Sequence, residues 1–421
     1  MAAQNEVLNF LPSRNGWPFP NDLSGTFPVV TLPVIGTIAS ADAGDGVCGG
    51  FTFTVRDLFE HRPLLAPDVN AAKPSQGSPT FGFLTSRFLD SLGPTGYANA
   101  VKAITWTQTS DHDVLLGWGL GHQMAATEWP AVKSTIDSGH LCPLYIIRAP
   151  QVGALDIPGI IDALGHSHQV LAYRYEIDDA ADVTIGIYDP NDPADDTSVI
   201  TLNVSNPTGN VGLGAPGIIA NIEDPQYKVR GFFAAQYVYK DPTSFGADVV
   251  TVNNAQFVSQ SVPANLGIGN AVSVTMRNTG GRAWSPSLGH RLGSQSPQDN
   301  ALWGTNREQL AGDVPPGQEA TFNFTLTSVP SSHATFQWRM VQEGVEWFGD
   351  FTPPVPFDAP NDAICAQLTG EITALQNEIA ELQKNLQHAA GSEKMSLIRQ
   401  IAQDDIKLGP LQRQKQQNGC P

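Results

Sequence analysis

The sequence is poor in cysteine and in charged residues. Its four cysteines are too few for a disulfide scaffold in a chain of 421 residues, and their spacing shows no metal-type pairing. Only 15% of the residues are charged, and 23 basic residues against 41 acidic ones give a net charge of −18. This acidic balance argues against nucleic acid or an anionic membrane surface as a partner.

Long apolar runs are also absent. No run reaches the length needed to cross a bilayer, so we expect no membrane span. Residues 1–6 lack the basic and apolar regions of a secretory signal, which leaves the location open between the cytoplasm and export by another route. Glycine, with 40 residues, and proline, with 32, are plentiful, which is typical of short strands and many turns. The length allows two or three domains.

One stretch, residues 45–60, places a cysteine at the start of a helical pattern. Phe51, Val55 and Leu58 fall on one face of the expected helix, and Cys48 lies at its N-terminal end. The unpaired N–H groups at a helix N-terminus favour a thiolate over a thiol, which is what a nucleophilic cysteine needs. The neighbouring glycines would let a substrate backbone approach closely. The competing interpretation is a buried structural cysteine.

A histidine and an aspartate occur at the ends of two expected strands further along the chain. His168 opens an alternating pattern, and a polar turn leads to a second strand, residues 183–188, which ends at Asp189 before a proline. Antiparallel pairing of the two strands would bring His168 close to Asp189. A base oriented by a third group is the geometry that activates a cysteine, so Cys48, His168 and Asp189 form the candidate catalytic set.

Other residues compete for these roles. His166 would share a strand face with His168, but only His168 begins the apolar alternation. His112 and His122 are expected at the surface or in packing. The aspartates that flank His112 could suggest a metal, but no second cluster supports one, so we expect neither a metal site nor a cofactor. Cys142 is interpreted as a core cysteine.

These neighbourhoods resemble papain-like cysteine peptidases, and a bacterial group among them most closely. The similar phrases are Cys-Gly-Gly from Cys48, His-Gln-Val-Leu-Ala from His168, and Tyr-Asp-Pro-Asn around Asp189. The resemblance implies a papain-like domain over residues 1–242, with a thiolate–imidazolium pair and an orienting aspartate. It also implies hydrolysis of, or transfer at, an amide or thioester in a protein or peptide substrate.

The family's oxyanion donor is missing from its usual place. The family has a glutamine shortly before the cysteine, whereas this sequence has Asp42, whose anionic side chain cannot donate to a developing oxyanion. We therefore expect Asn21, or a backbone N–H near Cys48, to take that role. Asn191 is the alternative to Asp189 as orienting residue, because members of the family use asparagine there.

Two other functions stay open. A toxin-like effector could use the same triad for deamidation or transglutamination. A catalytically silent binding or assembly protein could keep only the peptidase-like fold, and the absence of the glutamine favours this third hypothesis.

Residues 247–357 have an all-β texture. Apolar and polar residues alternate in three segments that turns separate: residues 272–277, 320–326 and 335–341. About a hundred residues of this pattern predict an immunoglobulin-like sandwich without a disulfide.

Four tryptophans in successive segments of this region, Trp284, Trp303, Trp338 and Trp347, add a second resemblance. Together with residues 257–263, 276–280 and 291–295, the region resembles the four-tryptophan domain of bacterial multidomain proteins and of a eukaryotic autophagy receptor. The resemblance implies a non-catalytic binding or spacer module, with a protein or carbohydrate partner. Core packing is the main interpretation of the tryptophans, and a binding face is the alternative.

Residues 361–421 carry a heptad pattern. The apolar residues of the first helix recur at three- and four-residue steps: Ile364, Leu368, Ile372, Leu375, Ile379, Leu382 and Leu386. After a break, a second helix is expected to use Met395, Ile398, Ile401 and Leu408, with a kink or end at Pro410. The sequence as a whole thus predicts a multidomain α+β protein that ends in an antiparallel helical hairpin.

The last two cysteines fall at the open base of this hairpin. Cys365 lies near the beginning of the first helix and Cys420 at the end of the second, so we expect a disulfide, which would imply an oxidising final location. The alternative is two unpaired thiols in a self-associating coiled coil.

Overall fold

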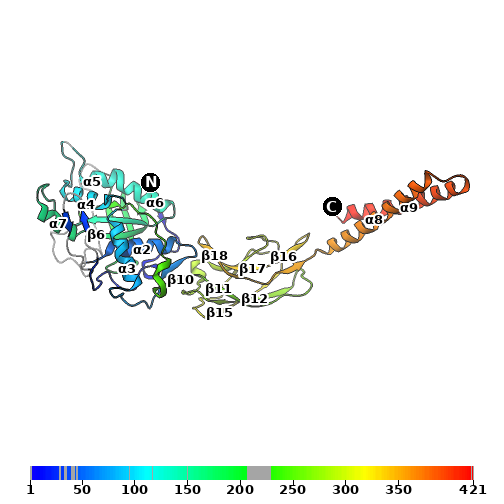
Figure 1. The fold of residues 1–421 in the computed structure, drawn as a ribbon, viewed down its shortest axis with the longest axis horizontal. Coiled ribbons are helices and arrows are strands. Elements are labelled where there is room, and N and C mark those ends of the chain that lie inside the picture. The colour runs from blue at the N-terminus through cyan, green and yellow to red at the C-terminus, as the bar shows by residue number, and fades with distance from the viewer. Residues whose placement is uncertain are drawn as a thin grey trace. The chain divides into compact units, whose positions relative to one another are not determined.

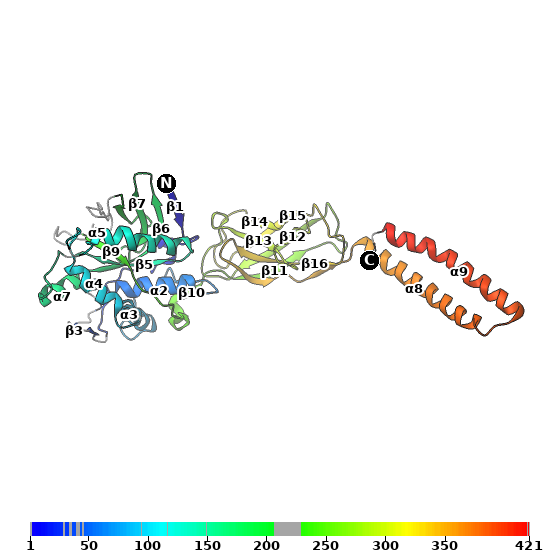
Figure 2. The same cartoon turned by 90° about the horizontal axis from the view of Figure 1, so that it is seen from above.

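The protein, for which we describe a computed structural model, is a mixed α+β chain with several antiparallel sheets and a C-terminal pair of helices (Figures 1 and 2). The structure describes residues 2–27, 30–32, 36–38, 43, 46–93, 95–115, 117–148, 150–205, 229–418 and 420. The chain divides into two compact units. The first comprises residues 1–254 with residues 280–282 and 344–346, and the second comprises the remainder.

A six-stranded antiparallel sheet forms the centre of the first unit. Its strands are, in spatial order, β8 (Val199–Asn203), β7 (Asp182–Tyr188), β6 (His168–Ile177), β5 (Cys142–Ile147) and β9 (Gly231–Ala234), with β1 (Ala3–Glu6) also pairing with β6. The alternating segments expected from His168 and up to residue 188 are therefore the neighbouring strands β6 and β7. The polar turn that joins them makes their pairing antiparallel.

Helices surround this sheet. They are α1 (Pro12–Asn15), α2 (Cys48–Glu60), α3 (Pro79–Ser91), α4 (Ala98–Gln108), α5 (Leu120–Gln123), the π-helical turn η2 (Met124–Glu128), α6 (Trp129–Asp137), α7 (Ile157–Gly165) and the 3₁₀ turn η4 (Thr243–Asp248). Helices α2 and α3 lie side by side in both views (Figures 1 and 2). Helix α2 also contacts β6 and is buried along most of its length. It is thus the central helix of the unit.

Two short ribbons complete the first unit. One joins β2 (Val30–Leu32) to β3 (Gly36–Ile38), and the other joins β4 (Leu65–Pro67) to β10 (Val249–Thr251). Strand β10 lies within residues 247–357, where we expected the β-sandwich. Its partner β4, however, follows α2 in the first unit. The first unit accordingly extends to residue 254.

Two antiparallel sheets share one apolar core in the second unit. One sheet contains β11 (Ala255–Ser261), β12 (Ala271–Asn278) and β15 (Glu319–Thr325), and the other contains β14 (Arg307–Gln309), β13 (His290–Ser294), β17 (Trp338–Gln342) and β18 (Glu346–Phe351). A 3₁₀ turn, η5 (Pro286–Leu288), and a pair formed by β16 (Ala334–Phe336) and β19 (Val355–Phe357) complete it. Strand β12 alternates buried with more exposed residues, as expected for a sheet with one face on a core, whereas β13 and β17 are buried along most of their length.

The tryptophans of this unit are mostly core residues. Trp284, Trp303 and Trp338 are fully buried, whereas Trp347 is half-buried and carries the Arg307 guanidinium 4.8 Å above its ring. Core packing therefore accounts for three of the four, and only Trp347 presents part of its ring to solvent.

The C-terminal helices are α8 (Pro360–Leu386) and α9 (Gly391–Gln417), which pack against each other. Cys365 and Cys420 form a disulfide with their Cα atoms 5.3 Å apart, which is the pairing that the heptad pattern suggested. Of the kink or end expected at Pro410, the end is wrong, because α9 continues through this residue. None of the helices in the described part of the chain is long and apolar enough to cross a bilayer.

The expected seam of α9 is also partly wrong. Met395 and Ile398 are 54% and 44% exposed. Ile401 and Leu408 of the expected seam are less exposed, and they share their face of α9 with Leu397, Asp404 and Leu411 rather than with Met395 and Ile398. When two helices pack together, each buries only one narrow stripe of side chains. Apolar residues outside that stripe remain exposed to solvent, so the apolar residues of the sequence alone do not show which face of the helix is buried.

Candidate active site

Cys48 is the first residue of α2. Its half-buried thiol lies where the helix begins, because Gly46 adopts a left-handed φ of 97° that turns the chain, and Val47 then accepts the first helical bond from Gly50 at 2.8 Å. The first N–H groups of the helix have no intrahelical partner and point toward this end. They give the surroundings of Cys48 a partial positive charge that favours a thiolate.

The two glycines after Cys48 serve packing rather than access for a substrate. A Cβ atom at Gly49 would overlap Ser91 of α3 and Gln169 of β6, and one at Gly50 would overlap the Leu84 carbonyl oxygen of α3. The expectation that these glycines open space for a substrate backbone is therefore wrong for both positions. They allow the central helix to approach α3 and the sheet closely, which holds Cys48 against the first residues of β6.

His168 and Asp189 are hydrogen bonded in the interior. His168 is the first residue of β6, Asp189 directly follows β7, and His168 Nε2 donates to Asp189 Oδ1 at 2.7 Å. Both side chains are buried. Asp189 Oδ1 also accepts from the backbone N–H of Asn191 at 2.9 Å. Asn191 therefore supports the orienting carboxylate with its main chain, and Asp189 is the side chain that orients the imidazole.

The second nitrogen of His168 is left for Cys48. Burial lowers the pKa of His168, but the charge and hydrogen bond of Asp189, together with a hydrogen bond to the Cys48 side chain, outweigh burial and raise the pKa well above its ordinary 6.5. Burial alone would raise the pKa of Asp189, yet His168 lowers it. The arrangement favours an imidazolium between a carboxylate and a sulfur.

Asn21 lies beside the same chain segments. Its backbone N–H donates to the Pro190 carbonyl at 3.1 Å, and its buried side-chain Oδ1 would be 3.2 Å from a Cβ atom at Gly46. Asn21 thus lies between the turn that leads to Cys48 and the residue that follows Asp189. Asp42, which stands where the family has its glutamine, falls outside the residues that the structure describes.

The competing histidines are elsewhere. His166 is not on the strand but follows α7, where its Nδ1 atom lies 2.8 Å from the Asp162 carbonyl oxygen. His122 stacks on Trp118 with ring centroids 4.0 Å apart and bonds Asp113 at 2.9 Å. Within the described ranges, no group of three or more His, Cys, Asp or Glu side chains could hold a metal ion.

The remaining free cysteine is a core residue, as expected. Cys142 opens β5 and is buried, and burial raises the pKa of its thiol to about 11. A neutral buried thiol of this kind is a poor nucleophile, so Cys142 does not compete with Cys48.

No pattern in the sequence singles out Arg148 as a functional residue. It directly follows β5 and is 6% exposed, and its charge contributes to lowering the pKa of Asp189 after the larger effects of His168 and Asn191. The available signal was a single arginine after an apolar strand, residues 142–147, which also occurs at many strand ends without function. Only the pairing of β5 with β6 brings Arg148 to the site.

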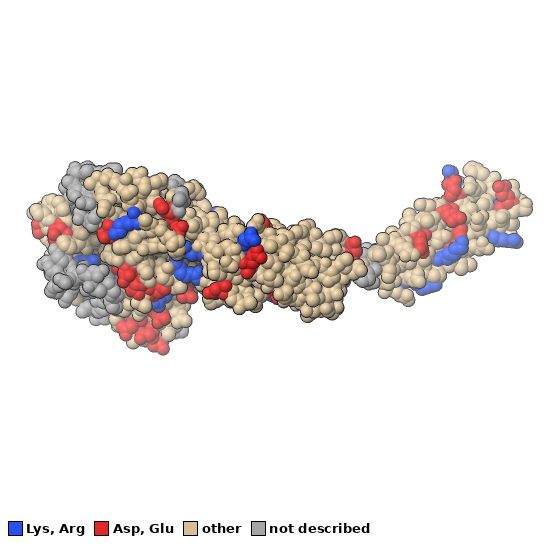
Figure 3. Space-filling model, turned by 90° about the horizontal axis from the view of Figure 1, so that it is seen from below, with Lys and Arg blue, Asp and Glu red and all other residues tan. Residues whose placement is uncertain are grey.

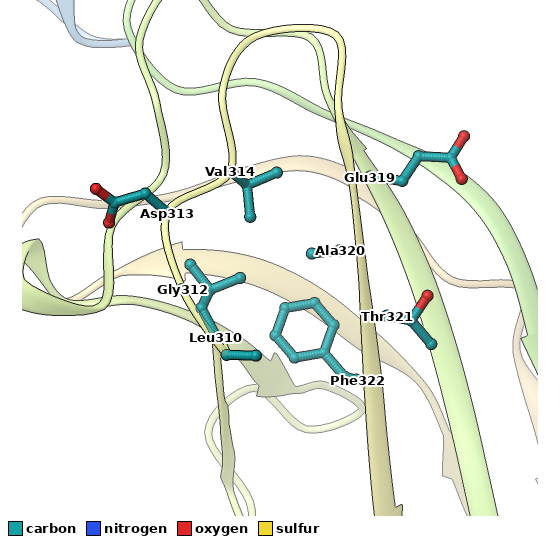
Figure 4. A pocket seen from close by; sticks show the side chains of 9 residues that line it. Leu310, Gly312, Asp313, Val314, Glu319, Ala320, Thr321 and Phe322 are labelled. Carbon is teal, nitrogen blue, oxygen red and sulfur yellow. The ribbon is translucent and has the colours of Figure 1, made fainter.

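A separate hollow lies on the second unit. It has a volume of about 240 Å³ and is lined by residues 310–314 and 319–322. Figure 4 shows Leu310 and Phe322 on either side of it. Its two carboxylates are already engaged, because Asp313 accepts from Ser285 at 2.5 Å and Glu319 pairs with Arg277 at 2.6 Å. This hollow holds none of the candidate catalytic residues.

Comparisons with known proteins leave the site to be interpreted from its own chemistry. No protein-family model matches the chain, and no curated protein matches it. What the structure offers is a cysteine at a helix N-terminus and a histidine that a buried aspartate orients and whose pKa the cysteine helps to raise. Such an arrangement can deprotonate a thiol and hold a proton ready for a leaving group.

Proposed function

We propose that the first unit is a papain-like cysteine hydrolase that acts on an amide or thioester of a protein or peptide. The observation that carries the proposal is the buried His168, whose Nε2 atom lies 2.7 Å from Asp189 Oδ1 and whose pKa Asp189 and Cys48 raise against the effect of burial. A cationic imidazole in this position stabilises a neighbouring thiolate, and the N-terminus of α2 adds to that effect.

The proposed reaction begins with the Cys48 thiolate. Its sulfur bonds the substrate carbonyl carbon, and the C=O electron pair moves to oxygen. Collapse of this intermediate breaks the bond to nitrogen, and the amine leaves with the proton of His168 Nδ1. Water then attacks the thioester and gives a proton to His168. The second collapse releases the carboxylic acid and restores the thiolate.

Two donors are available for the oxyanion in this scheme. One is the backbone N–H at the start of α2, and the other is the Asn21 side chain, which lies beside the turn before Cys48. Asn21 would take the place of the glutamine that papain-like peptidases use.

The second unit is proposed to be an immunoglobulin-like sandwich of the four-tryptophan kind that binds a protein or carbohydrate, or spaces the catalytic unit. The two sheets around one core and the three buried tryptophans support this assignment. Because the tryptophans are used mainly in the core, a spacer role is the simpler of the two.

The test is labelling of Cys48 with iodoacetamide across pH, read by mass spectrometry of the Cys48 peptide. We expect the intact protein to react far below the ordinary thiol pKa of about 8.5, and His168→Ala to lose this low-pH reactivity. His166→Ala is the matched control, since His166 lies two residues away and outside the site. Labelling that follows an ordinary thiol titration in all three proteins would remove the proposal.

A reactive Cys48 then allows the chemistry to be identified. Incubation with a peptide mixture that contains glutamine and lysine distinguishes the three alternatives by product mass. Cleaved peptides indicate hydrolysis, conversion of glutamine to glutamate indicates deamidation, and linked peptides indicate transglutamination. No product with a reactive Cys48 would favour the binding or assembly role.

A further inference from the structure

Arg148 is a buried cation whose hydrogen-bonding groups are only partly used. It is 6% exposed, and its Nε and Nη2 atoms have no hydrogen-bond partner in the described chain. Arg87, which is buried to a similar degree, instead donates to Asp57, Asp90 and the Val238 carbonyl. Each guanidinium nitrogen of Arg87 thus has a hydrogen-bond acceptor, whereas the Nε and Nη2 nitrogens of Arg148 have none.

The position of Arg148 places these groups at the candidate active site. In the pairing of β5 with β6, Ile146 lies opposite His168. Arg148 follows two residues later, at the same end of these two strands. Burial lowers the pKa of Arg148, while the charges of Asp189 and Cys48 act in the opposite direction, so both lie within electrostatic reach of the guanidinium.

An unpaired buried guanidinium is costly. Taking such a charge out of water costs several kcal/mol, and each buried N–H group without an acceptor adds to that cost. The charges of Cys48 and Asp189 offset part of it, but neither accepts a hydrogen bond from Nε or Nη2. A ligand that accepts from both atoms would complete the set, and a guanidinium matches the two oxygens of a carboxylate best.

We propose that Arg148 binds a carboxylate of the substrate next to the carbonyl that Cys48 attacks. The substrate class is then an acidic peptide or amide, with its carboxylate either at a free C-terminus or on an aspartate or glutamate side chain. This inference rests on the proposed function of Cys48. The chain carries a net charge of −18, and acidic side chains form clusters on the face of the first unit drawn in Figure 3, so a local cation is required to hold such a substrate.

The test compares two alkylating reagents at Cys48. Iodoacetate carries a carboxylate and iodoacetamide does not, and the ratio of their rates cancels any change in the amount of thiolate. Because hydrogen bonds to charged groups contribute more than neutral ones, we expect the ratio to fall about tenfold or more in Arg148→Met. Arg148→Lys should give an intermediate ratio, since it keeps the charge but loses the planar fork.

Arg174→Met is the matched control. Arg174 lies on β6, is half-buried and donates to the Tyr173 hydroxyl, so its removal changes the net charge equally without touching the site. Its ratio should equal that of the intact protein. An equal fall in Arg174→Met and Arg148→Met would show a general charge effect and overturn the proposal.

The outcomes separate this inference from the proposed function. If Cys48 reacts at low pH in a His168-dependent way but Arg148→Met leaves the ratio unchanged, the hydrolase proposal stands and Arg148 is only a counter-charge for Cys48 and Asp189. If Cys48 reacts with neither reagent, both proposals fail.

A second measurement uses the intact protein and does not depend on the folding of any variant. Acetyl-Ala-Ala with a free carboxylate, acetyl-Ala-Ala-amide and acetyl-Asp-Ala-amide are tested for protection of Cys48 from iodoacetamide. Protection by the first peptide alone indicates a C-terminal carboxylate, and protection by the third alone indicates an acidic side chain. Equal protection by all three, or by none, would contradict a carboxylate site.

Discussion

His168 receives its charge from two neighbours that are distant in sequence. Burial works against a protonated imidazole, and only the Asp189 carboxylate and the Cys48 side chain reverse this effect. His168 therefore depends on both neighbours for its charge, and substitution of either one tests that dependence.

Asp189→Asn should move the pH dependence of Cys48. The amide keeps the shape but not the charge, so burial then lowers the pKa of His168 and the imidazolium is lost at neutral pH. Without that cation the thiolate forms only near the ordinary thiol pKa of about 8.5, and iodoacetamide labelling at pH 6 should fall at least about tenfold. Asp192→Asn, at an exposed position three residues away, should leave the profile unchanged. An unshifted profile in Asp189→Asn would show that the carboxylate does not set the charge of His168.

Asn21→Ala should separate acyl transfer from alkylation. If Asn21 donates to the oxyanion, kcat for p-nitrophenyl acetate should fall about a hundredfold, the usual effect of losing one oxyanion donor. Labelling with iodoacetamide should not change, because alkylation develops no oxyanion. Asn191→Ala is the control, since Asn191 supports Asp189 through its backbone N–H and its side chain is not needed for that bond. Loss of both reactions in Asn21→Ala would indicate a structural role for Asn21.

Helices α2 and α3 are joined by a buried ion pair. Arg87 of α3 donates through Nε and Nη2 to Asp57 of α2 at 2.7 and 3.0 Å, and Asp57 also accepts from the Tyr237 hydroxyl at 2.5 Å. Asp57 lies nine residues after Cys48 on the same helix, so this pair fixes the rotation and height of the helix that presents the thiol.

Arg87→Met should lower the free energy of unfolding of the first unit by about 3–5 kcal/mol, because it leaves Asp57 buried without its partner. The double variant with Asp57→Leu should recover part of this loss, since no charge then remains unpaired. Lys73→Met, which removes the exposed pair with Asp22, should cost at most about 1 kcal/mol. Urea unfolding measures all three. A loss in Arg87→Met no larger than in Lys73→Met would contradict the role of the pair.

At the scale of the whole molecule, each of the two compact units contains an apolar core, whereas the C-terminal helices depend on a different kind of stabilisation. The first has a large apolar core around α2 and the sheet. The C-terminal helices bury few side chains, namely Leu368, Ile372, Ile379 and Asp404, and are closed by the bond between Cys365 and Cys420. Their stability should therefore depend on that bond much more than the stability of the first unit does.

Reduction of the disulfide tests this difference. The bond spans 55 residues, and the chain-entropy model assigns a loop of this length about 4 kcal/mol of stabilisation. We expect a reducing agent, or the double variant Cys365→Ser and Cys420→Ser, to lower the melting temperature of the helical transition followed by far-ultraviolet circular dichroism. Iodoacetamide labelling of Cys48 should stay the same. An unchanged helical transition would show that the α8–α9 contacts suffice without the bond.

Local patterns in the sequence determined the elements that carry the candidate site. The periodicity after Cys48 predicted α2, and the alternation from His168 with a turn before residue 183 predicted β6 and β7. Heptad spacing predicted the two C-terminal helices and the proximity of their cysteines. These features depend on residues close together in the chain, whose geometry follows from the helical and strand repeats.

Only the tertiary structure decided the features that arise between distant segments. The phase of α9 depended on which stripe meets α8, so Asp404 is buried while Met395 is exposed. The glycines after Cys48 had a packing role set by α3 and β6, which no local pattern expresses. Arg148 came to the site because β5 pairs with β6, and its unpaired N–H groups are a property of its buried surroundings. Burial and strand pairing depend on contacts throughout the fold, so a single stretch of sequence does not determine them.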